Sequence, residues 1–233
     1  MLTVRSPAEF PRRTNRGAWE LWSCHGGLLV TWPFRAPDPL HDDLPVDTPT
    51  FSTFFALLAL ACWAGSAVVL LLWLLARSKP ESGLALRFDE LRHGALWLGW
   101  IVALVTTSGS LYYSQVAHFV PCPLCWYQRI CMYPLSIVLL VAALRRDRAV
   151  WLTAGPLVLI GIGFAAYHTQ LQAFPDQHSA FCTTLEPCTT RYVWEFGFVS
   201  LPFMSLAAFV FVGIMVMLAR TASDPELNPD VAA

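Results

Sequence analysis

Four cysteines are grouped in two pairs whose spacing suits redox chemistry. Cys122 and Cys125 are separated by two residues, and Cys182 and Cys188 are separated by five residues that include Pro187. Cysteine thiolates attack disulfides, so two pairs that come together can pass a disulfide from one to the other. We therefore interpret the four cysteines as a relay and as the catalytic residues of the chain.

The residues around the first pair predict the start of a helix. Cys122 suits the N-cap position, and Pro123 suits the first helical position, where its missing N–H is not needed. Cys125 then lies in the first turn, where unpaired N–H groups and the positive end of the helix dipole stabilise a thiolate. Arg129 follows Cys125 by four residues and shares its helix face, so its charge would favour that thiolate further.

Three other interpretations of the four cysteines were weighed. Two structural disulfides stay open, because extracytoplasmic cysteines are usually paired. A zinc site of four thiolates would join pairs that a whole helical hairpin separates, and we expect no metal. Haem attachment requires a histidine where Trp126 follows Cys125. A purely structural role does not account for a CxxC motif that begins a helix one turn before an arginine, which favours the relay.

The elements that must position these residues are membrane-spanning helices. The chain has 233 residues, of which 56% are hydrophobic and 13% charged, against about 25% charged in soluble domains. Lys and Arg (15) balance Asp and Glu (16), which leaves no basic surplus for nucleic acid. Five runs reach the ~20 residues that span a bilayer: 52–76, 95–117, 123–144, 149–171 and 196–219. We predict an all-α polytopic membrane protein with five transmembrane helices.

Basic residues between the runs predict the orientation. Arg77, Lys79, Arg87 and Arg92 lie between the first two runs, and Arg145, Arg146 and Arg148 follow the third. By the positive-inside rule these loops face the cytoplasm, and the cysteine-bearing segments face the opposite, oxidising side. The predicted organisation is a disordered tail (1–51), a first transmembrane helix (52–76), a membrane domain with the other four helices (95–219) and a cytoplasmic tail (220–233). The tail could instead result from a start codon that was placed too far upstream.

Four further residues lie inside or beside the spans, and two of them, His168 and Arg129, have two interpretations each. His168 is the only one of six histidines near the outer end of a predicted span, which makes it either a functional candidate or a hydrogen-bonded interface residue. Cys62 and Cys131 are expected to pack as small apolar side chains. Arg129 has the alternative of extending towards lipid headgroups.

The cysteine motifs together resemble a known family. The string from Cys122 to Arg129, the pair Tyr167-His168, the later Cys182 and Cys188, and the run 196–198 resemble the bacterial disulfide bond formation protein B (DsbB) family, in particular its compact-loop, BdbC-like branch. Vitamin K epoxide reductase proteins, the nearest alternative, carry their loop cysteines before the CxxC motif rather than after it. The resemblance covers roughly residues 95–219.

This resemblance implies a four-helix transmembrane bundle, to which this chain adds one N-terminal transmembrane helix at 52–76. It implies a quinone-dependent protein-disulfide oxidoreductase in the bacterial cell (inner) membrane that re-oxidises an extracytoplasmic, DsbA-like thioredoxin-fold oxidase. Electrons then pass to a membrane quinone, menaquinone or ubiquinone. The partner would join to Cys182, Cys188 would exchange with Cys122, and Cys125 would face the quinone beside Arg129 and His168.

The chain departs from the family pattern in two respects, and other functions stay open. The additional span and the long N-terminal tail are not part of the pattern, and Gln128 stands where some members have an acidic residue. The alternatives are a non-catalytic membrane scaffold with two structural disulfides and a vitamin K epoxide reductase-like enzyme. The residues alone also leave open the reverse flow of electrons from a quinol.

Overall fold

The described part of the chain is entirely helical apart from its loops. The computed structural model describes residues 48–78, 83–177, 181–182 and 188–221, with the backbone alone for residues 83–90. Its elements are α1 (Thr48–Ser78), α2 (Gly83–Gln115), α3 (Pro123–Arg145), the short 3₁₀ helix η2 (Arg148–Val150), α4 (Trp151–Ala173) and α5 (Leu201–Arg220). All five α-helices are long and apolar enough to cross a membrane. The predicted all-α membrane architecture is confirmed.

The ends of two predicted segments differ from the structure. α1 already begins at Thr48, so residues 48–51 belong to a helix rather than to the predicted tail. The rest of that tail, with Cys24, and residues 222–233 of the predicted C-terminal tail lie outside the described residues. α1 can begin before the predicted residue because Pro49 falls in its first turn, where a helix tolerates proline.

The last helix begins at Leu201 and not at Phe196 as predicted. The main chains of Glu195 and Val199 exchange two hydrogen bonds of 2.9 Å each, which close a tight turn. Within this turn Phe196 has a φ of 51° and Gly197 a φ of 78°, both outside the right-handed helical region. The apolar run therefore starts before the backbone can become helical.

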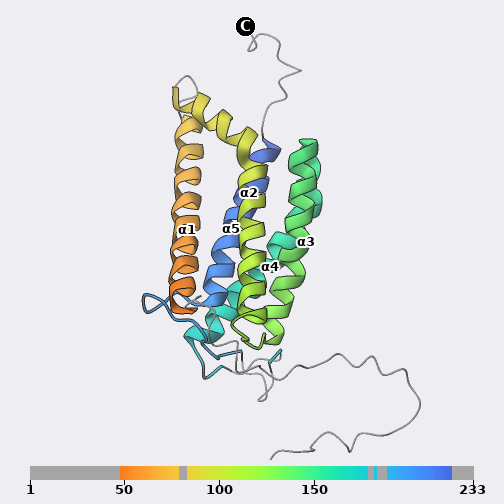
Figure 1. Cartoon of the computed structure of the whole chain (residues 1–233). Coiled ribbons are helices and arrows are strands. Elements are labelled where there is room, and N and C mark those ends of the chain that lie inside the picture. The colour runs from red at the N-terminus through yellow and green to blue at the C-terminus, as the bar shows by residue number, and fades with distance from the viewer. Residues whose placement is uncertain (1–47, 79–82, 178–180, 183–187, 222–233) are drawn as a thin grey trace, which may run out of the picture. The chain divides into compact units, whose positions relative to one another are not determined.

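Four of the helices form a bundle, and the fifth lies against it. α2 and α4 each pack against both α3 and α5, whereas α1 packs against α5 and, less extensively, α2 (Figure 1). Leu135 and Leu139 of α3 and Phe209 of α5 are completely buried in the core of the bundle. Gly161 allows α4 to approach α5 closely, because the Phe209 ring occupies the space that a side chain at this position would need. Large apolar side chains on the outer helix faces are exposed, as expected for contact with lipid.

The antiparallel course of the bundle brings both cysteine segments to one end. The α2–α3 connection, the α4–α5 connection and the start of α1 lie at the same end of the helices (Figure 1). Basic residues gather at or near the other helix ends: Arg77, Arg92, Arg145, Arg146, Arg148 and Arg220. One end of the bundle therefore carries the sulfur chemistry and the other carries the positive charge.

Candidate functional site

The CxxC pair lies at the first turn of α3, as predicted. Cys122 is the N-cap residue, and its Sγ accepts a hydrogen bond from the backbone N–H of Cys125 at 3.4 Å. Pro123 occupies the first turn. The two sulfur atoms are 3.0 Å apart and the pair is in the dithiol form. Capping by a sulfur fixes the position of Cys122 relative to the helix.

The hydrogen bonds place the negative charge on Cys122 rather than on Cys125. The predicted thiolate was Cys125, because it lies under the helix N-terminus. The hydrogen bond between the two sulfurs, with smaller contributions from His168 and the Cys125 N–H, lowers the pKa of Cys122 despite burial. In the dithiol form the N-cap position therefore favours a thiolate at Cys122.

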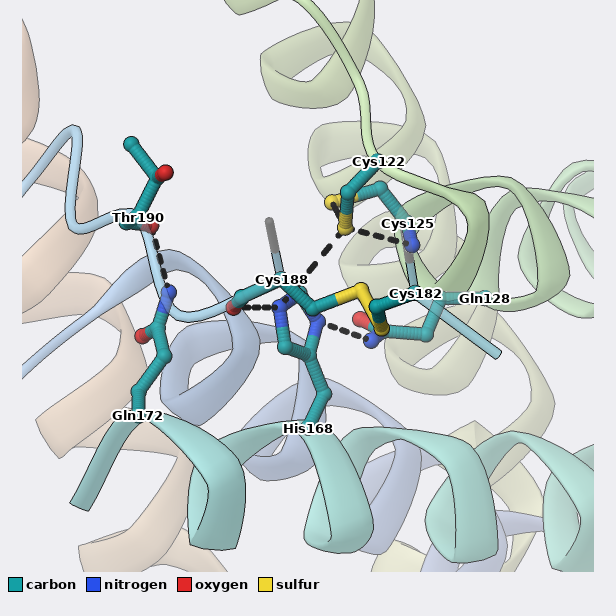
Figure 2. The surroundings of a disulfide bond; sticks show 8 residues. All are labelled: Cys122, Cys125, Gln128, His168, Gln172, Cys182, Cys188 and Thr190. Atoms are coloured by element: carbon teal, nitrogen blue, oxygen red, sulfur yellow. Dashed lines mark hydrogen bonds between the residues drawn. A yellow bond between two sulfur atoms is a disulfide. The ribbon is translucent and has the colours of Figure 1, made fainter. Parts of the chain in front are cut away.

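His168 links the two cysteine pairs (Figure 2). Its side chain is 2% exposed, and Nε2 lies 3.0 Å from the carbonyl oxygen of Cys188 and 3.7 Å from Sγ of Cys122. A carbonyl oxygen can only accept, so Nε2 carries a hydrogen. Nδ1 then accepts a hydrogen bond from Nε2 of Gln128 at 3.0 Å. The Gln128 amide thus orients the imidazole so that its N–H faces both sulfur-bearing segments.

The loop pair forms a disulfide beside the CxxC pair. Cys182 and Cys188 are joined, with their Cα atoms 5.8 Å apart. Cys188 is buried in a small apolar cluster with Cys122 and Leu124, and both Cys182 and Cys125 pack against this cluster. The four cysteines predicted to act together are therefore close in space. A zinc site of four thiolates is not formed, because two of the sulfurs are bonded to each other.

The segment that follows Cys188 is attached to the end of α4. Nε2 of Gln172 donates to the carbonyl oxygen of Thr190 at 2.9 Å. The guanidinium of Arg191 donates through two nitrogens to the carbonyl oxygen of Gln172 and lies 4.0 Å from the centre of the Trp194 ring. These contacts hold one side of the disulfide loop to the helix that carries His168.

Arg129 lies beside a cavity and not on the outer surface. Nη2 of Arg129 donates to the carbonyl oxygen of Ser110 at 3.0 Å, and the guanidinium lies 5.3 Å from the centre of the Trp126 ring. Arg129 and Cys125 both line a cavity of about 140 Å³, here called the Arg129 cavity. The predicted proximity of Arg129 to Cys125 therefore takes the form of a shared cavity wall.

The walls of the Arg129 cavity suit a flat, largely apolar ligand. Helices α1 to α5 all contribute side chains to it, among them Phe55, Tyr113, Met132, Tyr133, His168 and Met204. An apolar cavity of about 150 Å³ is known to admit one benzene ring. The Arg129 cavity thus has room for one aromatic ring, next to the Cys125 sulfur and a guanidinium.

A second cavity of about 210 Å³ lies on the side of the disulfide loop and is here called the Thr190 cavity. It is lined by Cys122, Cys188 and Thr190, and it shares Cys125 and His168 with the Arg129 cavity. Cys125 and His168, with Leu201 and Pro202, therefore form the partition between the two cavities, and Cys122 lies on the side of the Thr190 cavity. One side of the partition reaches the loop disulfide and the other reaches the space between the helices.

Three side chains of the site have metal-binding atoms in close proximity. The sulfurs of Cys122 and Cys125 and a ring nitrogen of His168 lie within 4.8 Å of one another, and among the described residues no further His, Cys, Asp or Glu joins this group. The hydrogen on Nε2 of His168 is engaged with the Cys188 carbonyl oxygen. The arrangement on these atoms is a hydrogen-bond network between two redox pairs.

Some residues of the site were missed from the sequence. Gln128 was noted only as a departure from the family pattern, although a polar residue within a span, three positions after Cys125, is a signal for the same helix face. Cys62 was expected only to fill space, yet it lines the Arg129 cavity with Phe55 and Ala59. No sequence signal pointed these α1 residues towards the cavity.

Comparison with known proteins places the chain in a family. The sequence profile of the family described as "Disulfide bond formation protein DsbB" matches residues 92–219. A "Probable disulfide formation protein" of Coxiella burnetii is 39% identical over 142 residues, which are 60% of this chain and 97% of that protein. "Disulfide bond formation protein C" of Bacillus subtilis is 38% identical over 126 residues, which are 54% and 91% of the two chains.

A "Probable disulfide formation protein" of Chlamydia trachomatis is 37% identical over 130 residues, covering 56% of this chain and 95% of that one. No solved structure matches the chain at a significant level. The profile covers more than half of the chain and includes the CxxC motif, His168 and both loop cysteines. The chain therefore belongs to the DsbB family of disulfide-forming, multi-pass membrane proteins.

Proposed function

We propose that the protein is a thiol–quinone oxidoreductase that re-oxidises an extracytoplasmic, thioredoxin-fold disulfide oxidase. The observation that carries this proposal is the partition described above. Cys122 packs with the loop cysteine Cys188, while its neighbour Cys125 lines a ring-sized cavity with Arg129. A disulfide can thus be passed on at one face and electrons withdrawn at the other.

The exchange steps start with both pairs oxidised. A thiolate of the partner attacks Cys182, which forms a mixed disulfide and releases Cys188 as a thiolate. Cys188 attacks Cys122 and releases Cys125. The second partner thiol then displaces Cys182, which attacks Cys188 and restores the loop disulfide. The partner leaves oxidised, and the CxxC pair keeps two electrons as a dithiol, the form that the structure shows.

Several side chains support the second half of the reaction. A quinone ring in the Arg129 cavity supplies the acceptor for the two electrons and two protons that leave when Cys122 and Cys125 become a disulfide. Arg129 holds its guanidinium at the cavity wall through Ser110 and Trp126, with further N–H donors left to bind a carbonyl oxygen. His168 stabilises the Cys122 thiolate through Nε2–H. Apolar walls exclude water from this side of the pair.

A quinone is a suitable acceptor on energetic grounds. Oxidases that introduce disulfides are among the most oxidising thiol–disulfide couples, so re-oxidising one by another thiol pair is unfavourable. A lipid-soluble acceptor that removes electrons irreversibly from Cys122 and Cys125 pulls the exchange forward. The five apolar helices give such an acceptor direct access from the bilayer.

The orientation follows from the charges at the two ends of the bundle. The basic residues at the end opposite to the cysteines favour the cytoplasm. Cys182 and Cys188 then face the extracytoplasmic side of the bacterial cell membrane, where thiol oxidation proceeds. Membrane-impermeant thiol reagents applied to intact cells after reduction should label the loop pair.

The decisive experiment uses the purified full chain in lipid nanodiscs. The protein is reduced, freed of reductant under anaerobic conditions and mixed with a short-chain quinone. We expect Cys122 and Cys125 to form a disulfide at a rate that depends on quinone concentration, as mapped by mass spectrometry. The non-catalytic scaffold with two structural disulfides would be indicated if the thiols stayed reduced at every quinone concentration.

A further inference from the structure

Helix α1 is an addition to the family domain, yet it borders the site. The family profile begins at residue 92, after the end of α1 at Ser78. The 142-residue alignment with the Coxiella burnetii protein covers 97% of that relative, and it is too short to contain both α1 and the whole region up to residue 219. A helix that lies outside the family profile therefore contributes to the Arg129 cavity.

Three residues on one face of α1 line that cavity. Phe55, Ala59 and Cys62 follow one another at helical spacing and all line the cavity that Cys125 and Arg129 also line. Phe55 fits against Gly109 of α2, where a Cβ atom would lie 2.8 Å from the Phe55 ring. Ala59 is buried, with 5% of its surface exposed, so a larger side chain at this position would have to enter the cavity that Ala59 lines.

The start of α1 is held in register by contacts on both sides. The hydroxyl of Tyr113 donates to Oγ of Ser52 at 3.3 Å, and this hydrogen bond is buried. Oγ1 of Thr53 donates to a carboxylate oxygen of Glu195 at 3.3 Å. The Phe51 ring stacks on Tyr112 with 4.3 Å between the ring centres. These contacts fix the height at which the Phe55–Cys62 face meets the cavity.

We propose that α1 is a wall of the quinone site, and that Ala59 sets how large a ring system the site accepts. This inference rests on the proposed function and deepens it. In a bundle without α1 the cavity would open to lipid at this face. With α1 in place, the ring must fit between Ala59 and the Cys125–Arg129 side.

The first test enlarges Ala59. For Ala59→Leu we expect the KM for a short-chain benzoquinone to rise about tenfold, since a side chain that intrudes into a fitted site costs on this order. A two-ring naphthoquinone of the same tail length should suffer more than the one-ring compound. Quinone-independent exchange between the loop disulfide and a reduced thioredoxin-fold protein should be unchanged. Ala61→Leu is the matched control, because Ala61 is exposed on the same helix.

The second test needs no variant and therefore does not depend on how Ala59→Leu folds. Cys62 is a free cysteine in the wall, whereas Cys131 is free but buried in the bundle core. A fully substituted benzoquinone has no ring position for thiol addition, so it can protect without reacting. We expect it to slow alkylation of Cys62 by N-ethylmaleimide in nanodiscs and to leave Cys131 unaffected.

The outcomes separate the two proposals. If quinone re-oxidises the wild-type protein, yet Ala59→Leu matches Ala61→Leu and Cys62 is not protected, the role of α1 is wrong and the proposed function stands. If quinone does not re-oxidise the wild-type protein, the proposed function fails and this inference fails with it. Raised KM values for Ala59→Leu, or protection of Cys62 alone where that variant does not fold, would support the wall.

Discussion

The two cysteine pairs lie in one apolar cluster but are held in different ways. Cys122 and Cys125 belong to the first turn of α3, where the N-cap hydrogen bond fixes the Cys122 sulfur, and Cys122 is buried while Cys125 is half-buried. Cys182 and Cys188 belong to a loop, and Cys188 is buried while Cys182 is only half-buried. This difference determines which kind of substrate each pair can react with. A fixed pair beside a cavity suits a small acceptor, and a loop disulfide with an accessible sulfur suits a protein.

An arginine stands next to each pair in a nearly identical setting. Arg129 donates to the Ser110 carbonyl oxygen and lies over Trp126. Arg191 donates to the Gln172 carbonyl oxygen and lies over Trp194. Only Arg129 lines the Arg129 cavity. The same side-chain chemistry thus serves two purposes, and position rather than charge decides between them.

The largest effect is expected from replacing cysteines of either pair by serine. Cys122→Ser or Cys125→Ser should abolish quinone-linked turnover, because the acceptor side loses its disulfide, while the loop disulfide still exchanges once with a reduced partner. Cys182→Ser with Cys188→Ser should abolish oxidation of the partner but retain quinone-dependent oxidation of a small dithiol. Quenched-flow assays with both thiol substrates measure this. If the CxxC variants and the loop-pair variant lost activity equally with the protein partner and with the small dithiol, the two pairs would not have separate roles.

The second prediction concerns the charge on Cys122. A lowered pKa keeps the thiolate as pH falls below the ordinary thiol value, and the thiolate is lost only when pH falls through the lowered value. Alkylation of Cys122 in the dithiol form should therefore change little between about pH 8 and about pH 6. Cys125→Ala removes the main donor, so the rate should fall by up to about tenfold for each pH unit.

Cys125→Ser serves as the control for this prediction, because its hydroxyl can still donate to the Cys122 sulfur. It should lie closer to the native protein than Cys125→Ala does. Identical pH profiles for all three proteins would show that the hydrogen bond between the two side chains does not set the charge.

The sequence predicted the elements well and the contacts between them less well. Five spans follow from apolar length alone, and the N-cap at Cys122 follows from the proline after it, since both are local properties. The start of α5 was predicted too early, because the run from Phe196 is apolar although its backbone turns. The hydropathy of a segment does not indicate which helices it packs against, so the packing of α1 against α5 and α2 could not be predicted.

The site shows the same division between local and long-range information. The four cysteines, Arg129 and His168 were selected by type and spacing. The choice of Cys122 over Cys125 as the thiolate depends on which sulfur receives the donors, and the role of Gln128 depends on a contact with another helix. Both are tertiary contacts that one chain without its fold does not reveal.

A smaller effect is expected from Gln128, which acts through His168. Gln128→Leu removes the donor that orients the imidazole, and a hydrogen bond of about 0.5–1.5 kcal/mol corresponds to a loss of roughly twofold to tenfold in turnover. Gln128→Glu replaces the amide donor with a carboxylate that can only accept, so it should lose turnover as Gln128→Leu does. Unchanged turnover in both variants would mean that the amide has only a packing role.

Effects of similar size should come from the two arginines, and they should fall on different substrates. Lysine keeps the charge but loses the planar fork that bonds a carbonyl oxygen while lying over a ring. Arg129→Lys should raise the KM for quinone about threefold to tenfold, on the scale of one hydrogen bond, with the KM for the thiol partner unchanged. Arg191→Lys loosens the segment after Cys188 from Gln172 and should raise the KM for the partner alone. Each variant is the control for the other in one steady-state assay that varies both substrates. A crossed result, with Arg191→Lys acting on quinone, would mean that the loop and the Arg129 cavity are coupled through the partition that contains Cys125 and His168, so that the two settings could not be treated as separate.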